Sequence, residues 1–192
     1  MSDQRRVFIA LPLAPEAADS LSRWIGKFSR KSQLQLRLVA LEGLHLTLIP
    51  PWYAGDEEIK EIEKTLEDAA ANVKPFAISL TQVSYGPDPR SPRLIWATGP
   101  HSAEAEKFRS GLYQKLRESG LGAREAEKRN LLTHVTLARF NPEAAIGLIK
   151  EPIEDKGFEV RSAISGVSLM ESLLSPAGVR YETIRFAKFP EN

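Results

Sequence analysis

The chain has 192 residues, of which 42% are hydrophobic and 27% are charged, as in a globular protein with a sizeable core. Its formal net charge of +1 excludes an overall basic field for long nucleic acid, so any basic site must be local. Because cysteine is absent, disulfides, thiolate metal sites and cysteine nucleophiles are excluded.

The length fits one domain or two tightly packed lobes. No apolar run approaches the roughly 18 residues of a membrane span. The N-terminal apolar run is short and contains Pro12, so it is better read as a strand than as a signal peptide. We therefore expect a cytoplasmic protein without a membrane anchor, and a monomer.

Strands and helices alternate in the first half of the chain. Hydrophobic periodicity predicts strands at residues 6–11, 34–39, 43–49 and 76–80, and helices at residues 15–30 and 56–72. Pro50 and Pro51 are expected to end the third strand.

A similar order follows in the second half. The predicted elements are strands at residues 93–98, 131–138 and 158–169, helices ending near residues 120 and 150, and a hairpin of residues 167–173 and 179–189 around a turn at 175–178. A stiff loop is expected at residues 86–92 and a basic connector at 124–130. We interpret residues 5–81 and 92–170 as an internal duplication with the C-terminal hairpin, 167–189, added.

One four-residue pattern occurs in both halves, as HLTL at residues 45–48 and HVTL at residues 134–137. Side chains alternate along a strand, so each histidine shares a face with the threonine two residues later. A single strand histidine is more often structural than catalytic. The repetition, in a chain with only three histidines, favours a functional site.

Two such strands on either side of a cleft suit in-line displacement at phosphorus. One imidazole can take a proton from the nucleophile while the other protonates the leaving oxygen, and each step contributes about 10²–10⁴-fold. The threonine hydroxyls can donate hydrogen bonds to the non-bridging oxygens. This chemistry requires no metal and no other cofactor.

Competing sites find less support. A zinc site needs three or more ligands, and the third histidine, His101, has no carboxylate cluster beside it. The G-x-S-x-G and G-x-x-x-x-G-K-[ST] motifs of serine hydrolases and P-loop proteins are absent. A non-catalytic nucleotide- or RNA-binding module and a metal-dependent phosphoesterase stay open as alternatives.

Three further residues are candidates for substrate contacts. Trp52 and Tyr53 follow the first motif, where they can stack on a base or pack against the next helix. Arg139 follows the second motif. In an ideal strand Arg139 faces away from His134, so it reaches the site only if the strand bends or ends there.

The sequence resembles the 2H phosphoesterases, which are named for paired H-x-T-x motifs, and more narrowly the RNA 2′,3′-cyclic phosphodiesterases, also described as LigT-like or as 2′-5′ RNA ligases. Matching segments are residues 6–12, 44–48, 94–96, 134–139 and 172–181. The first motif departs from the family pattern, because it continues with Ile49, two prolines, Trp52 and Tyr53.

The resemblance implies a bilobal α+β fold with two pseudo-symmetric, largely antiparallel sheets, helices packed on the outside and a central cleft. It also implies metal-independent hydrolysis of 2′,3′-cyclic phosphate ends, on RNA or small cyclic nucleotides, to 2′-phosphomonoesters. The same residues would serve reversible 2′-5′ ligation. By motif matching, the acid–base pair is His45 and His134, and the phosphate is held by Thr47, Thr136 and Arg139.

Overall fold

The computed structural model describes residues 4–88, 90–121, 130–149, 151–175 and 178–191. Its strands are β1 (Arg5–Pro12), β2 (Arg37–Leu38), β3 (His45–Ala54), β4 (Phe76–Leu80), β5 (Gln82–Gly86), β6 (Leu94–Thr98), β7 (His134–Arg139), β8 (Val160–Ile164), β9 (Gly166–Ser175) and β10 (Gly178–Lys188). The helices are α1 (Pro15–Lys31), α2 (Asp56–Ala70) and α3 (Ala103–Glu118), with 3₁₀ turns η1 (Leu41–Gly43) and η3 (Glu143–Ala145).

The strands form an α+β arrangement in which every described pairing is antiparallel. One eight-stranded sheet has the order β10-β9-β1-β3-β7-β6-β5, with β2 added beside β7, and β4 pairs with β8 in a second sheet. The predicted antiparallel α+β class is confirmed. The two sheet halves of the large sheet are joined by one residue pair, Leu46 with Val135.

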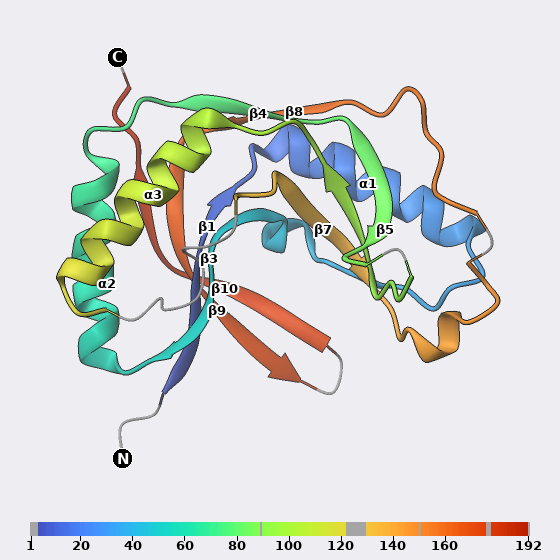
Figure 1. The fold of residues 1–192 in the computed structure, drawn as a ribbon, viewed down its shortest axis with the longest axis horizontal. Helices are drawn as coiled ribbons and strands as arrows, with labels where there is room; N and C mark the ends of the chain where they lie inside the picture. The colour runs from blue at the N-terminus through green and yellow to red at the C-terminus, as the bar shows by residue number, and fades with distance from the viewer. Residues whose placement is uncertain (1–3, 89, 122–129, 150, 176–177, 192) are drawn as a thin grey trace.

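Each half of the large sheet covers its own hydrophobic core (Figure 1). Strands β1, β3 and β9 pack with α2 and α3 around the first core. Strands β5, β6 and β7 pack with α1 around the second. Two helices therefore pack away from the strands next to them in the sequence. Helix α1, which follows β1, packs in the second core, and α3, which follows β6, packs in the first. None of the described helices is long and apolar enough to cross a lipid bilayer.

Helix α2 shows how local sequence sets these elements. Its buried residues, Ile59, Ile62, Leu66 and Ala70, recur every three to four positions and form one apolar stripe. Its first turn is acidic, which suits the positive end of the helix dipole. The backbone N–H of the residue before α2, Gly55, donates to the Glu58 carboxylate at 2.9 Å and closes that end.

The predicted end of the first His-Thr strand at Pro50 and Pro51 is wrong, because β3 continues to Ala54. The register between β1 and β3 shifts at this point, and Phe8 of β1 faces both prolines. Such a β-bulge interrupts the hydrogen-bond ladder, so the amide hydrogens that proline lacks are not needed there. The structure thus places two prolines inside a strand without losing the pairing on either side.

Other boundaries also differ from expectation. The edge strand at 34–39 contracts to the two residues of β2, and β5 was not predicted, since it follows β4 after a single residue. The helix at 142–150 is only the turn η3, which a glycine with positive φ, Gly147, follows. The strand at 158–169 is divided into β8 and β9. The connector 124–129 and the turn residues 176–177 lie outside the described residues, and the duplication itself stays a prediction.

Gly99, which follows β6, marks a close approach that only glycine permits. A Cβ atom there would lie 1.8 Å from the backbone oxygen of Ser79. We expect Gly99→Ala to lower the free energy of unfolding by about 1–3 kcal/mol, because the backbone must move apart. Urea denaturation measures this change.

The matched control is Gly111→Ala in α3, where an added Cβ meets nothing within 4 Å. That substitution should preserve or raise stability, since alanine is the better helix former. Equal stability of the two variants would show that the approach at Gly99 is not tight.

Candidate active site

The two motif strands, β3 and β7, lie side by side and begin with the two histidines. Leu46 and Val135 are paired and fully buried, so the residues on either side of each point to the opposite face. On that face His45, Thr47, His134 and Thr136 line one cavity of about 320 Å³. The structure therefore brings together all four residues of the repeated pattern.

The cavity is basic and partly aromatic. Its lining comprises Arg6, Phe8, Val39, Gly43, His45, Thr47, Pro51, Pro87, Arg93, Leu94, Trp96, His134, Thr136, Arg139 and Tyr181. Three arginines and two histidines are included, and no aspartate or glutamate is. This charge distribution favours an anionic ligand.

Arg139 reaches the cavity through a β-bulge. Thr136 pairs with Trp96, and Ala138 pairs with the adjacent Ile95, so one residue of β7 between them has no partner. The extra residue reverses the alternation of side chains beyond it. Arg139 consequently points to the same face as Thr136, which an ideal strand would not allow.

The first motif contains the same irregularity. Thr47 pairs with Ala10, and Ile49 pairs with the adjacent Ile9. The position that corresponds to Arg139 is occupied by Pro50, which carries no charge. The two halves of the site therefore share their backbone geometry, but only the second half supplies an arginine at this point.

Both histidines are held by the same backbone contact. Nδ1 of His45 lies 2.7 Å from the carbonyl oxygen of Gly43, and Nδ1 of His134 lies 3.0 Å from that of Leu132. A carbonyl oxygen only accepts, so Nδ1 carries the proton in both rings. Nε2 of each imidazole is therefore the nitrogen that can exchange a proton with a ligand.

Burial disfavours the protonated form of both imidazoles. Desolvation, assisted by the nearby charges of His134 and Arg139, outweighs the bond to Gly43 and lowers the pKa of His45 to about 4. Desolvation also lowers the pKa of His134, against the bond to Leu132. His45 is thus a proton acceptor at neutral pH.

Tyr181, from the C-terminal hairpin, connects the two halves of the site. Its ring meets that of His45 edge-on at 5.0 Å between centroids, and its hydroxyl accepts a hydrogen bond from Nη2 of Arg139 at 3.1 Å. A Cβ atom on Gly43 would lie 3.1 Å from the Tyr181 ring, so the glycine makes room for it. Residues 172–181 resembled the family's closing hairpin, but no local pattern indicated that Tyr181 reaches this cavity.

One further aromatic ring packs against each imidazole. The ring of Phe8 lies 4.9 Å from that of His45, and the ring of Trp96 lies 5.1 Å from that of His134. Trp96 is fixed in turn by a 2.8 Å hydrogen bond from its Nε1 to Ser84. These contacts limit the rotation of both imidazoles.

Trp52 and Tyr53, the candidates for base stacking, do not line this cavity. Trp52 pairs with Val7 and packs against the first core, on the sheet face opposite Phe8. This placement corrects the expectation for Trp52, because strand alternation turns its ring away from the site. Tyr53 is 60% exposed, and the aromatic rings at the cavity come from other strands.

Within the described part of the chain, no three histidine, aspartate or glutamate side chains gather closely enough to hold a metal ion. The third histidine, His101, is exposed and does not line the cavity. The residues at the cavity therefore suit proton transfer and anion binding rather than metal coordination.

Two H-x-T motifs on adjacent strands of an antiparallel sheet are the arrangement that the resemblance to the 2H phosphoesterases implied. A comparison with family models tests this class. The model of the 2′-5′ RNA ligase superfamily matches residues 17–175, and the chain belongs to this superfamily. The resemblance drawn from the paired motifs is thereby confirmed.

Individual relatives agree with this placement. A protein of Archaeoglobus fulgidus named RNA 2′,3′-cyclic phosphodiesterase is 29% identical, over 94% of this chain and 98% of its own. A protein of the same name from Methanothermobacter thermautotrophicus is 29% identical, over 92% of this chain and 94% of its own.

Solved structures share the fold. A Thermus thermophilus protein has a TM-score of 0.76 at 24% identity, over 96% of this chain and 97% of its own. Escherichia coli LigT, in a complex with 3′-AMP, has a TM-score of 0.73 at 21% identity, over 98% of this chain and 100% of its own.

The depressed pKa of His45 predicts a loss of stability in acid. In the unfolded chain a histidine has its ordinary pKa near 6.5, so between about pH 6.5 and 4 the unfolded state binds a proton that the native state does not. The free energy of unfolding should therefore fall as the pH falls through this window. Urea denaturation at pH 7 and pH 4.5 should show a smaller loss for His45→Gln than for the wild type. His101→Gln is the control and should keep the wild-type loss, whereas an equal loss in the two variants would contradict the burial of His45.

Tyr181→Ala should raise the pKa of His45 towards 6.5, because it opens the imidazole to water. The pKa is measured by NMR titration of the ring protons. Tyr181→Phe keeps the ring and should leave that pKa low. Tyr53→Ala removes an exposed tyrosine outside the cavity and is the matched control. An unchanged pKa in Tyr181→Ala would show that other groups desolvate His45.

Proposed function

We propose that the chain is a metal-independent RNA 2′,3′-cyclic phosphodiesterase that hydrolyses cyclic phosphate ends to 2′-phosphomonoesters. The observation that carries the proposal is one cavity holding two imidazoles, each with a free Nε2, two threonines and three arginines. The names of the archaeal relatives support the same activity.

In the proposed reaction, a water oxygen attacks the phosphorus and the bond from phosphorus to O3′ breaks. His45 takes the proton from the water through Nε2. His134 enters the step as an imidazolium, protonated on Nε2 beside the anionic phosphate, and gives that proton to O3′. We assign the base to His45 because the charges of both Arg139 and His134 disfavour its protonation, whereas burial alone disfavours that of His134. The product keeps the phosphate on O2′, and both histidines return to their starting states by exchange with solvent.

Charge builds on the non-bridging oxygens as the water attacks. Thr47 and Thr136 are proposed to donate hydrogen bonds to these oxygens, one from each half of the site. Arg139 adds a charge-assisted bond, and its guanidinium is oriented by the hydroxyl of Tyr181. Donors fixed before the reaction stabilise the transition state without reorganising.

The substrates in this proposal are RNA ends or small cyclic nucleotides. In 2′-5′ ligation a 5′-hydroxyl would take the place of water and O3′ would again leave, so the two histidines would keep their roles. By microscopic reversibility, cleavage of the 2′-5′ linkage would exchange these roles. A cytoplasmic location and a monomeric state remain part of the proposal.

His45→Ala and His134→Ala should each reduce hydrolysis of adenosine 2′,3′-cyclic phosphate by at least about 10²-fold, since each removes one proton-transfer step. The assay contains a chelator, and ³¹P NMR identifies the product as the 2′-phosphate. His101→Ala removes the histidine outside the cavity and should retain wild-type turnover.

Undiminished turnover in both cavity variants would reject the two-histidine mechanism. Tight nucleotide binding by the wild type without any turnover would instead identify a non-catalytic binding module.

A further inference from the structure

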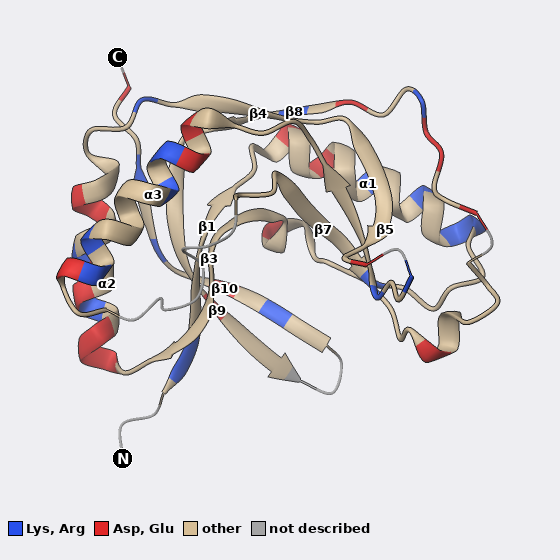
Figure 2. Cartoon of the chain, in the orientation of Figure 1, with Lys and Arg blue, Asp and Glu red and all other residues tan. Residues whose placement is uncertain are grey.

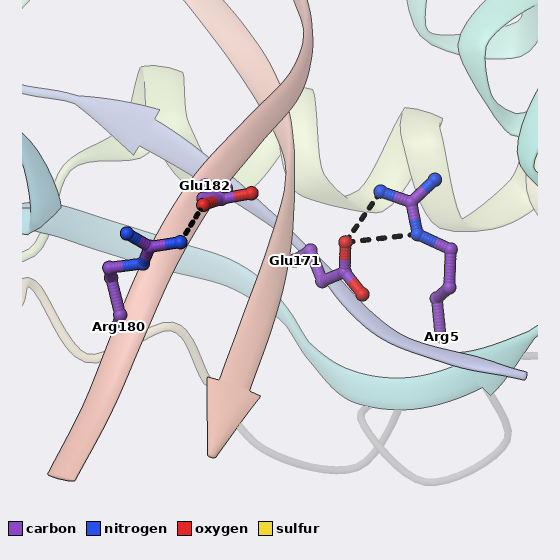
Figure 3. Close-up of polar contacts among 4 residues, drawn as sticks. All are labelled: Arg5, Glu171, Arg180 and Glu182. Carbon is purple, nitrogen blue, oxygen red and sulfur yellow. Dashed lines mark hydrogen bonds and ion pairs between the residues drawn. The ribbon is translucent and has the colours of Figure 1, made fainter. Parts of the chain in front are cut away.

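Strands β10, β9 and β1, at one end of the large sheet, carry charged side chains on both of their faces. Arg5 contacts Glu171 at 2.5 Å, and Arg180 pairs with Glu182, as Figure 3 shows. Glu171 is paired across the sheet with Val7, which belongs to the first core, so it lies on the face that the helices cover. The carboxylates of Glu171 and Glu182 therefore pair with arginines on the face away from the cavity.

Arg6 lies on the other face, where it lines the cavity. Its Nη1 donates a 2.8 Å hydrogen bond to the hydroxyl of Ser172, a residue only 4% exposed. Among the residues that the structure describes, no carboxylate pairs with Arg6. The guanidinium is therefore positioned by a neutral group, and its charge stays available to an anion.

Figure 2 shows the wider charge pattern around this arginine. Acidic residues are prominent along α2, acidic and basic residues are mixed along α3, and basic residues colour the start of β1 and part of β10. Since no aspartate or glutamate lines the cavity, the positive charge of Arg6 is not cancelled there.

Arg6 is too far along β1 to share the phosphate held by the threonines. Thr47 pairs with Ala10, and Arg6 precedes Ala10 by four residues, which is about 13 Å at the usual rise of a strand. Phe8, which supports His45, lies between them. This separation of the backbone positions points to a second anionic group as the partner of Arg6, apart from the reacting phosphate.

We propose that Arg6 binds the phosphate on O5′ of the nucleoside whose 2′,3′-cyclic phosphate is cleaved. This inference rests on the proposed function, because it places the cyclic phosphate between the two histidines. The only other phosphate of a terminal nucleotide lies on O5′, across the ribose. A cavity of about 320 Å³ is at the lower end of the range for small-molecule sites, as suits a single nucleotide. The preferred substrate thus carries a 5′-phosphate or a preceding nucleotide, rather than a 5′-hydroxyl.

Calorimetry with two product-like nucleotides tests this subsite without requiring turnover. The wild type should bind adenosine 2′,5′-bisphosphate about tenfold more tightly than adenosine 2′-monophosphate, which is the gain of one charge-assisted hydrogen bond. Arg6→Gln should bring that ratio close to one. Ser172→Ala keeps the charge but frees the guanidinium, so it should lower the ratio by a smaller factor.

Arg180→Gln is the matched control, since it removes one exposed arginine from the same strands on the opposite face, and it should keep the wild-type ratio. The inference is overturned if Arg6→Gln keeps the ratio, if the wild type shows no preference, or if neither nucleotide binds. It is also overturned if Arg93→Gln, at the other side of the cavity, is the variant that loses the ratio.

The same titration separates this inference from the proposed hydrolysis. A wild-type protein that binds the bisphosphate through Arg6 but turns over no cyclic phosphate would refute the hydrolysis and retain the subsite. Turnover of 5′-hydroxyl and 5′-phosphorylated substrates with equal KM would refute the subsite and retain the hydrolysis.

Discussion

The contact between β3 and β7 at Leu46 and Val135 is the constraint on which the site depends. Two motifs that are far apart in the sequence become neighbours because one buried pair joins the two halves of the sheet. Side-chain alternation then turns both histidines and both threonines to the face opposite that pair. A shift of one of these strands by one residue would turn its own histidine and threonine into the core and its aliphatic side chains into the cavity.

The cavity combines two features that oppose each other. Phe8, Trp96 and Tyr181 pack against the imidazoles and exclude water from them. This burial lowers the pKa of both histidines and so disfavours a positive charge on either ring. The arginines supply that charge from fixed positions at the edge of the same space. In so restricted a volume the attraction for a phosphate is stronger than it would be in open water, and a bound phosphate would in turn favour protonation of one histidine.

Sequence reasoning could predict what depends on local pattern. Periodicity gave the helices and most strands, and the repeated H-x-T phrase placed His45 beside Thr47 and His134 beside Thr136. Sequence reasoning could not predict that α1 packs in the second core and α3 in the first. The apolar face of a helix shows that the helix is packed, but not against which strands. The bulge in β3 depends on its pairing with β1, and the bulge in β7 depends on its pairing with β6. The sequence alone therefore could not predict the orientation of Arg139 or the continuation of β3 through Pro50. Tyr181 arrives from the far end of the chain and has no local signal.

The most direct test of this account is an NMR titration of the wild-type protein with adenosine 2′-monophosphate, following the Hε1 resonances of His45 and His134. If the two imidazoles hold one phosphate between them, both resonances shift together along a single isotherm with one nucleotide bound per chain, while that of His101 stays in place. A shift of only one of the two, or two separate isotherms, would contradict the claim that the motifs form one site.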